Sequence, residues 1–169
     1  DALGGVEVES EYAFTTSYDS GLVMNVQQGT NTFNGKQALA FSRERQNVPG
    51  GDNQRGKDQQ AVITGIIKKM VSPAMLTGAN QLLNSVSGNV DTNMSEQQIQ
   101  ELIKMQISDG ASWNITSMAA EGTGDKQYCY SYSGAPLYVM QPDQASVEAI
   151  RQAIDAVENG EILGVTAIE

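Results

Sequence analysis

The chain contains no histidine and a single cysteine, Cys129, and these absences exclude several kinds of chemistry. Without histidine there is no Ser-His-Asp or Cys-His arrangement and no imidazole general base. One cysteine forms no disulfide within the chain, and zinc sites built from cysteine and histidine are excluded. Because Cys129 lies between Tyr128 and Tyr130 in a run typical of a strand, we expect it to be buried as a packing residue.

Long apolar runs and excess positive charge are also missing. No stretch of about 18 apolar residues occurs, so the sequence offers no membrane span. Acidic residues outnumber basic ones by 20 to 10, and the net charge of −10 argues against non-specific nucleic-acid binding, which needs a broad basic field. With 169 residues, 40% of them apolar, the chain is long enough to bury one substantial core.

The few basic residues are concentrated in one segment. Between Lys36 and Lys69 there are seven basic residues and only three acids. Three of the basic residues are arginines that flank a turn-forming Pro-Gly-Gly: Arg43, Arg45 and Arg55. A guanidinium stays charged at any working pH and donates to two phosphate oxygens at once, so the cluster indicates a site for a phosphorylated ligand. Ordinary solvated salt bridges remain an equally good explanation from charge alone.

Apolar spacing and turn residues predict a mixture of helices and strands. The expected strands are 6–9, 21–26, 113–118 and 127–140, with a turn at 27–32. The expected helices are 35–43 capped by Asn34, 53–72, one beginning at Pro73, one capped by Ser95, and 143–158. Helices packed on a sheet in this order predict a layered α/β or α+β fold.

The expected helix 53–72 combines polar and aliphatic residues along one face. Arg55 and Gln59 lie one helical turn apart and share that face. The row continues with four branched aliphatic residues, Val62, Ile63, Ile66 and Ile67. A phosphate near the helix N-terminus would meet free N–H groups, and a lipid tail would lie along the aliphatic part. The alternative is that the aliphatic residues simply face the core.

The order of residues in this region resembles a family signature. The run Asn-Gly-Lys-Gln-Ala-Leu-Ala-Phe-Ser-Arg-Glu-Arg at 34–45 is followed by Gly51-Asp52, Arg55 and Gln59-Gln60. This order resembles the signature of the LytR-CpsA-Psr proteins of Gram-positive cell envelopes, and residues 3–8 resemble the segment that precedes it. The resemblance is specific over about residues 1–72 and loose beyond them.

The resemblance implies a function. Members of the family are membrane-anchored enzymes on the extracellular face of the cytoplasmic membrane, and they attach teichoic acids or capsular polysaccharides to peptidoglycan. They take the polymer from a polyprenyl pyrophosphate carrier and form a phosphodiester, usually with Mg²⁺. The implied fold is a layered α/β/α domain with a central mixed sheet and a hydrophobic tunnel for the prenyl chain.

The resemblance also assigns roles to residues of this chain. Arg43 and Arg45 match the paired arginines that contact the pyrophosphate, and Arg55 and Gln59 match the arginine and glutamine beyond the turn. Asp52 matches the aspartate before that arginine, so Asp52 and Arg55 are the implied catalytic pair. We expect Asp52 to orient Arg55 rather than to accept the proton of the sugar hydroxyl, with a helix N-cap as its structural alternative.

One departure limits what the chain is expected to do. In the family the metal-binding aspartates lie upstream of the Gly-Gly segment at which this chain opens. We therefore expect residues 1–160 to be the C-terminal portion of the catalytic domain and 161–169 a tail. No metal ligands are expected in this chain: the Mg²⁺ ligands are expected upstream of it, and the membrane anchor outside it. Alone, the chain is expected to be inactive.

Two other classes of function stay open. The chain is alternatively a non-catalytic module that binds lipid phosphate or wall glycan. A transcriptional regulator is the weaker alternative, because DNA reading needs a basic recognition helix and the body of this chain is acidic.

Overall fold

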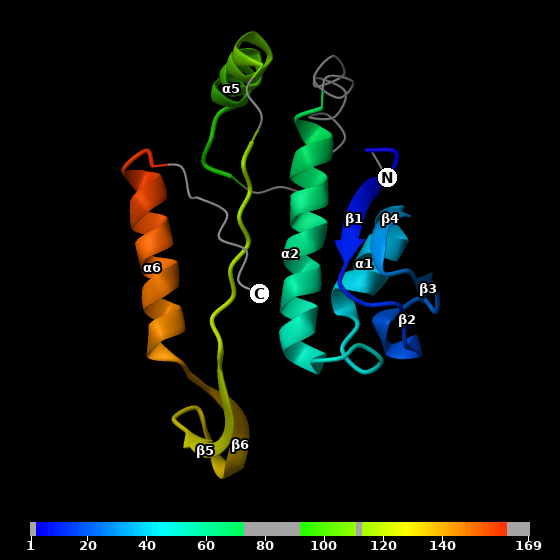
Figure 1. Ribbon diagram of the computed structural model, residues 1–169, viewed down its shortest axis with the longest axis vertical. Coiled ribbons are helices and arrows are strands. Elements are labelled where there is room, and N and C mark those ends of the chain that lie inside the picture. Colours follow the sequence, from blue (N-terminus) through cyan, green and yellow to red (C-terminus); the bar gives the residue numbers. More distant parts are fainter. Residues whose placement is uncertain (1–2, 73–91, 111–112, 162–169) are drawn as a thin grey trace. The chain divides into compact units, whose positions relative to one another are not determined.

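The structure is a computed structural model that describes residues 3–72, 92–110 and 113–161. The chain divides into two compact units, Asp1–Ile115 and Thr116–Glu169 (Figure 1). The helix expected from Pro73 and the tail after residue 161 lie outside the described residues. That residues 1–160 belong to one catalytic domain stays a prediction.

The first unit begins with two short antiparallel strand pairs. Strand β1 (Val6–Ser10) pairs with β4 (Gly29–Phe33), and β2 (Phe14–Thr15) pairs with β3 (Asn25–Val26). Alternate residues of β1 are buried, as expected of a strand with one face on the core. The strand predicted at 6–9 is therefore confirmed.

Two neighbouring predictions are wrong. Most of the expected turn at 27–32 is strand β4. Its Gly, Asn and Thr residues favour a turn, but backbone hydrogen bonds to β1 hold the segment as a strand. Of the expected strand 21–26 only β3 forms. The preceding segment is instead held by Thr16, whose hydroxyl donates to the carbonyl of Leu22 at 2.6 Å and accepts from the N–H of Met24 at 2.8 Å.

Helices α1 (Gly35–Arg43) and α2 (Gly51–Met70) form at the expected places. Asn34 caps α1 in a reciprocal box with Gln37, with N···O distances of 3.0 and 2.9 Å. Helix α2 begins two residues earlier than the pattern indicated. Gly50 precedes it with a φ of 84°, a left-handed conformation that allows the sharp entry into the helix.

The core of the first unit lies between these elements. Phe41 is completely buried, with its ring 5.9 Å from that of Phe14 and 5.3 Å from that of Phe33. The buried cluster consists of Val6, Val8, Val26, Phe33, Ala38 and Phe41. Helix α2 lies along β1 and packs against this cluster from one side (Figure 1).

Gly65 marks the closest approach of α2 to β1. A Cβ at this position would lie 2.3 Å from the carbonyl oxygen of Glu7 and 3.5 Å from the side chain of Val8. Only a residue without a side chain lets the helix backbone come this near to the strand. The helix that carries Arg55 is thereby fixed against the core.

Helix α5 (Glu96–Asp109) follows later in the range of the first unit. It is capped by Ser95 as predicted, in a second reciprocal box with Gln98. It buries no residue completely. The segment 113–118, expected as a strand, has no regular structure, because no strand pairs with it in the part of the chain that the structure describes.

The second unit consists of a hairpin and a helix. Strand β5 (Gly122–Cys129) pairs antiparallel with β6 (Tyr132–Pro142), and α6 (Gln144–Glu158) is capped by Asp143. The strand expected at 127–140 is divided between β5 and β6. Pro136 lies in β6 beside the irregular register at 127–129, where no ladder donor is needed. Cys129, expected to be buried, is only half-buried.

The mixed α/β class is confirmed. The described strands, however, form three separate two-stranded antiparallel sheets and not one central sheet. Helix α6, like α5, buries no residue completely, and Ile154 and Val157 on it are more than half exposed. Among the described residues no helix is both long and apolar enough to cross a membrane.

Candidate functional site

The predicted phosphate-binding arginines lie around the corner between α1 and α2. Arg43 is the last residue of α1, Arg45 lies in the connection, and Arg55 lies in the second turn of α2. The side chains of Arg43 and Arg45 are exposed, and Arg55 is half-buried. Since the two helices pack together, these three cations share one end of the helix pair.

Glu44, between the first two arginines, is the buried centre of this corner. Its side chain has no exposed surface. One carboxylate oxygen, Oε1, accepts hydrogen bonds from the N–H groups of Arg45, Gln46 and Asn47 at 3.0, 2.7 and 3.0 Å. The other, Oε2, accepts from the N–H of Ser17. Four backbone donors therefore converge on one side chain.

These donors keep Glu44 charged. Burial acts to raise the pKa of Glu44, but the backbone hydrogen bonds, first among them that from Ser17, outweigh it and lower the pKa to about 2. The side chain is therefore a carboxylate at every pH in ordinary use. This role is not evident from the sequence, because an acid between two arginines resembles a solvated ion-pair partner.

Asp52 and Arg55 form the arrangement expected of an orienting pair. The Oδ1 atom of Asp52 lies 2.8 Å from Nη2 of Arg55. The N-cap alternative for Asp52 is wrong, since Gly50 occupies the N-cap and Asp52 lies inside the first turn of α2. Its catalytic role stays a prediction.

Gln59 joins α2 to the end of α1. Its side-chain Nε2 donates to the carbonyl of Ser42 at 3.2 Å, directly before Arg43. Gln59 therefore lies beside the arginine cluster, as the shared helix face predicted. The pyrophosphate-binding roles of Arg43, Arg45, Arg55 and Gln59 stay predictions.

The aliphatic row beyond Gln59 is divided between two environments. Val62 and Ile66 pack against the buried core cluster, in agreement with the alternative that the aliphatic residues face the core. Ile63 is 56% exposed and lies one turn beyond Gln59, while Ile67 is half-buried. The prediction that this row lines a lipid tail stays strongest for Ile63.

Asp58 is a second buried acid near the cluster, and sequence reasoning missed it too. It is 2% exposed, and its Oδ1 accepts from Nε2 of Gln54 at 3.0 Å. Among the residues that the structure describes, its Oδ2 has no hydrogen-bond partner. Burial raises the pKa of Asp58 to about 6, the bond from Gln54 opposes the rise, and the negative charge of Glu11 adds to it.

Asp58→Asn is therefore expected to stabilise the protein at neutral pH. An acid whose pKa is higher in the folded than in the unfolded chain destabilises the fold above that pKa. The pKa of Asp58 is 3.8 in the unfolded chain and about 6 in the folded chain. The increase in the free energy of unfolding caused by Asp58→Asn should therefore be near zero below pH 3.8, grow between these two pH values, and reach a plateau of about 1–3 kcal/mol above pH 6. Urea unfolding of both proteins across this range measures it.

The matched control for this substitution is Asp109→Asn, which changes an exposed aspartate at the end of α5. Because Asp109 is exposed, we expect its substitution to change the free energy of unfolding at neutral pH by much less than Asp58→Asn does. A gain from Asp58→Asn that is independent of pH would contradict the assignment of a buried, partly unpaired carboxylate.

The acids around the arginine cluster do not fit a magnesium site. The carboxylate of Glu44 is fully used by backbone donors, and that of Asp52 faces Arg55. Asp58 offers one unpartnered oxygen, whereas Mg²⁺ prefers several oxygen ligands in octahedral geometry. Across residues 3–72, 92–110 and 113–161 no group of three metal-binding side chains occurs.

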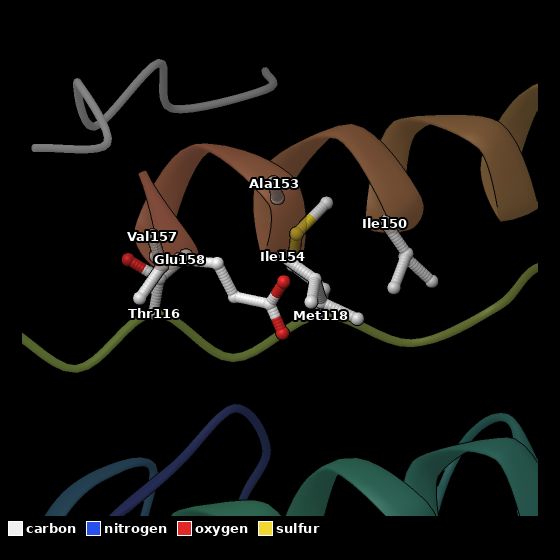
Figure 2. A pocket seen from close by; sticks show the side chains of 7 residues that line it. All are labelled: Thr116, Met118, Ile150, Ala153, Ile154, Val157 and Glu158. Carbon is white, nitrogen blue, oxygen red and sulfur yellow. The ribbon is translucent and has the colours of Figure 1, made fainter. Parts of the chain in front are cut away.

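The second unit contains an apolar pocket of about 270 Å³. Figure 2 shows its lining, with Thr116 and Met118 on an extended segment and the other residues on α6. These are Ile150, Ala153, Ile154, Val157 and Glu158. None of the described residues that line it is basic.

A comparison with protein-family models identifies the family of this chain. The model of the LytR_cpsA_psr family matches residues 1–154, which is most of the sequence. This chain belongs to the LytR-CpsA-Psr family. The resemblance of residues 1–72 to its signature is thus confirmed and extends into the second unit.

Two curated relatives from different species are named as transferases. The polyisoprenyl-teichoic acid–peptidoglycan teichoic acid transferase TagU of Bacillus subtilis (strain 168) is 32% identical over 154 residues, which cover 91% of this chain and 46% of that protein. The protein of the same name from Oceanobacillus iheyensis is 36% identical over 125 residues, 74% of this chain and 37% of that protein. The chain spans less than half the length of these relatives.

Solved structures of the family share the fold. The crystal structure of B. subtilis TagU matches with a TM-score of 0.61 at 28% identity, over 98% of this chain and 61% of that chain. The family protein YwtF (TagT) with bound octaprenyl pyrophosphate lipid matches with a TM-score of 0.52 at 20% identity, over 90% of this chain and 51% of that chain. At that identity the second match shows the fold alone.

Proposed function

We propose that this chain supplies the pyrophosphate-binding arginines of an enzyme that transfers a glycopolymer, a teichoic acid or a capsular polysaccharide, from a polyprenyl pyrophosphate carrier to peptidoglycan. The observation that carries the proposal is the corner at which Arg43, Arg45 and Arg55 meet in the family's signature order. It is supported by the names of the curated relatives and by the lipid bound to YwtF (TagT).

The reaction is a phosphoryl transfer. A hydroxyl of the peptidoglycan acceptor attacks the phosphorus that carries the glycan, the bridging bond to the second phosphate breaks, and polyprenyl phosphate leaves as the hydroxyl proton is released. Such a reaction needs neutralisation of the non-bridging oxygens and alignment of the acceptor. Arg43 and Arg45 neutralise the pyrophosphate, while Asp52 directs the guanidinium of Arg55 toward it.

The remainder of the enzyme lies in other parts of the protein. We propose that the upstream half of the domain provides the Mg²⁺ ligands, that an anchor outside this chain holds the protein at the extracellular face of the cytoplasmic membrane, and that this chain alone is inactive. The exposed side chain of Ile63 gives the first part of the prenyl chain an apolar surface beside Gln59.

A transfer assay tests this proposal. The chain is incubated with a lipid-linked glycopolymer, a peptidoglycan acceptor and Mg²⁺, both alone and with the upstream segment restored. We expect the product only when the upstream segment is present, and loss of the product with Arg55→Ala. Turnover by the 169 residues alone would refute the need for an upstream half, and full turnover by the Arg55→Ala protein would refute the role of the cluster.

A further inference from the structure

The hydrogen bonds around Glu44 form an anion-binding arrangement that the protein itself occupies. Three successive N–H groups, those of residues 45–47, point at Oε1 of Glu44 within 3.0 Å. Successive backbone amides that converge in this way bind anions. Here the anion is the carboxylate of the residue that directly precedes them, so the path of the chain from Arg43 to Asn47 depends on one side chain.

The second carboxylate oxygen ties this corner to a separate segment. Oε2 of Glu44 accepts from the N–H of Ser17, directly before a short 3₁₀ turn at Tyr18–Ser20. The turn is itself held by the buried hydroxyl of Ser20, which donates to the carbonyl of Ser17 at 2.7 Å. Nη1 of Arg43 lies 3.9 Å from the position that a Cβ on Gly21 would take. Glu44 therefore fixes both the backbone after Arg43 and the segment beside its guanidinium.

Because these bonds satisfy the Glu44 carboxylate, it forms no ion pair with the neighbouring arginines in the part of the chain that the structure describes. A carboxylate next to two exposed guanidinium groups would ordinarily pair with one of them and reduce its attraction for a ligand. In the described part of the chain, neither Arg43 nor Arg45 forms an ion pair with a carboxylate. Backbone donors satisfy the Glu44 carboxylate instead, and both arginine side chains stay exposed to solvent.

We propose that Glu44 is a positioning residue for pyrophosphate binding: it fixes the backbone that carries Arg43 and Arg45 while its own charge is satisfied internally. The inference rests on the proposed function of the arginines and adds a residue that touches no ligand. It makes Arg45 the residue through which Glu44 acts most directly, because the Arg45 N–H is itself one of the donors.

The test uses the variant Glu44→Gln, whose amide keeps the shape of the side chain but loses its charge. We expect the affinity for polyprenyl pyrophosphate, measured by calorimetric titration below the unfolding transition, to fall about tenfold or more. In the Arg45→Ala background the same substitution should cost much less, since the group through which it acts is gone. Equal losses in both backgrounds, or an unchanged affinity, would overturn the proposal.

Two further variants separate positioning from stability. Val8→Ala removes buried core volume from β1, which carries none of the arginines, so it should lower the unfolding temperature without changing the affinity. Ser17→Pro serves if Glu44→Gln does not fold. Ser17 has a φ of −77°, which proline adopts readily, and the substitution removes one donor to Glu44 while leaving the glutamate in place. It should weaken pyrophosphate binding, and an affinity equal to that of the wild type would overturn the proposal.

An NMR measurement in the absence of ligand tests the positioning role of Glu44 separately from the proposed function. The chain has only four arginines, so their Nε–Hε NMR signals are readily assigned. In Glu44→Gln we expect those of Arg43 and Arg45 to shift and that of Arg151 to stay. If the wild type does not bind polyprenyl pyrophosphate even with the upstream segment restored, the proposed function fails. Unchanged Arg43 and Arg45 signals in the folded variant would then overturn the positioning role on their own.

Discussion

Replacing Arg55 with alanine is expected to weaken the binding of polyprenyl pyrophosphate by about 10- to 100-fold. Losing one hydrogen bond between charged groups costs roughly 1.5–3 kcal/mol, which corresponds to a fall in affinity of about 10- to 100-fold. Arg55 is half-buried and held by Asp52, so little entropy is lost when it binds an anion. Calorimetric titration of wild type and variant, with circular dichroism to confirm folding, measures the effect.

The matched control is Arg151→Ala, which removes the same charge from the second unit. Arg151 lies on α6 in ion pairs with Glu148 and Asp155, at 2.7 and 2.9 Å, and has no place in the proposed site. Its loss should leave the affinity within about twofold, because exposed ion pairs contribute little. Equal losses from Arg55→Ala and Arg151→Ala would show that the chain attracts the lipid only through its overall charge.

Gly65→Ala is expected to destabilise the first unit by about 3 kcal/mol or more, because it inserts a methyl group where the backbones of α2 and β1 meet. The new Cβ would lie 2.3 Å from the carbonyl oxygen of Glu7, and backbone atoms on both sides prevent relief by side-chain rotation. Helix α2 would have to move away from the core, which would also displace Arg55. Urea unfolding followed by circular dichroism measures the loss.

Gly56→Ala provides a control in the same helix. A Cβ at Gly56 meets nothing within 4 Å, so only the intrinsic helix propensity changes. Alanine is the better helix former by about 1 kcal/mol, and the variant should be slightly more stable than the wild type. If Gly65→Ala were tolerated as well as Gly56→Ala, the close packing of α2 on β1 would be wrong.

The helices were predictable because the residues that cap them lie next to them in the sequence. Asn34 and Ser95 each form the reciprocal cap that their sequence pattern indicates, and Asp143 caps α6. The apolar spacing of α2 likewise identified the helix and the face that carries Arg55 and Gln59. Signals contained within a few residues need no knowledge of the rest of the fold.

Strand β4 and the two buried acids depend on partners that are distant in the sequence, so the sequence alone did not reveal them. Strand β4 looks like a turn until β1 lies beside it. Glu44 and Asp58 look like solvated acids in a basic segment, and only the packing of the first unit buries them. The order of the arginines predicted the candidate site, but the carboxylate that arranges the site became visible only in three dimensions.

The corner between α1 and α2 is the proposed binding site for the pyrophosphate of a polyprenyl carrier. The most direct test is a titration of polyprenyl pyrophosphate into the wild type and into the double variant Arg43→Ala/Arg55→Ala, with the upstream segment restored in both. We expect saturable binding by the wild type and its loss in a folded double variant. Binding of equal affinity by both proteins, or none by the folded wild type, would contradict it.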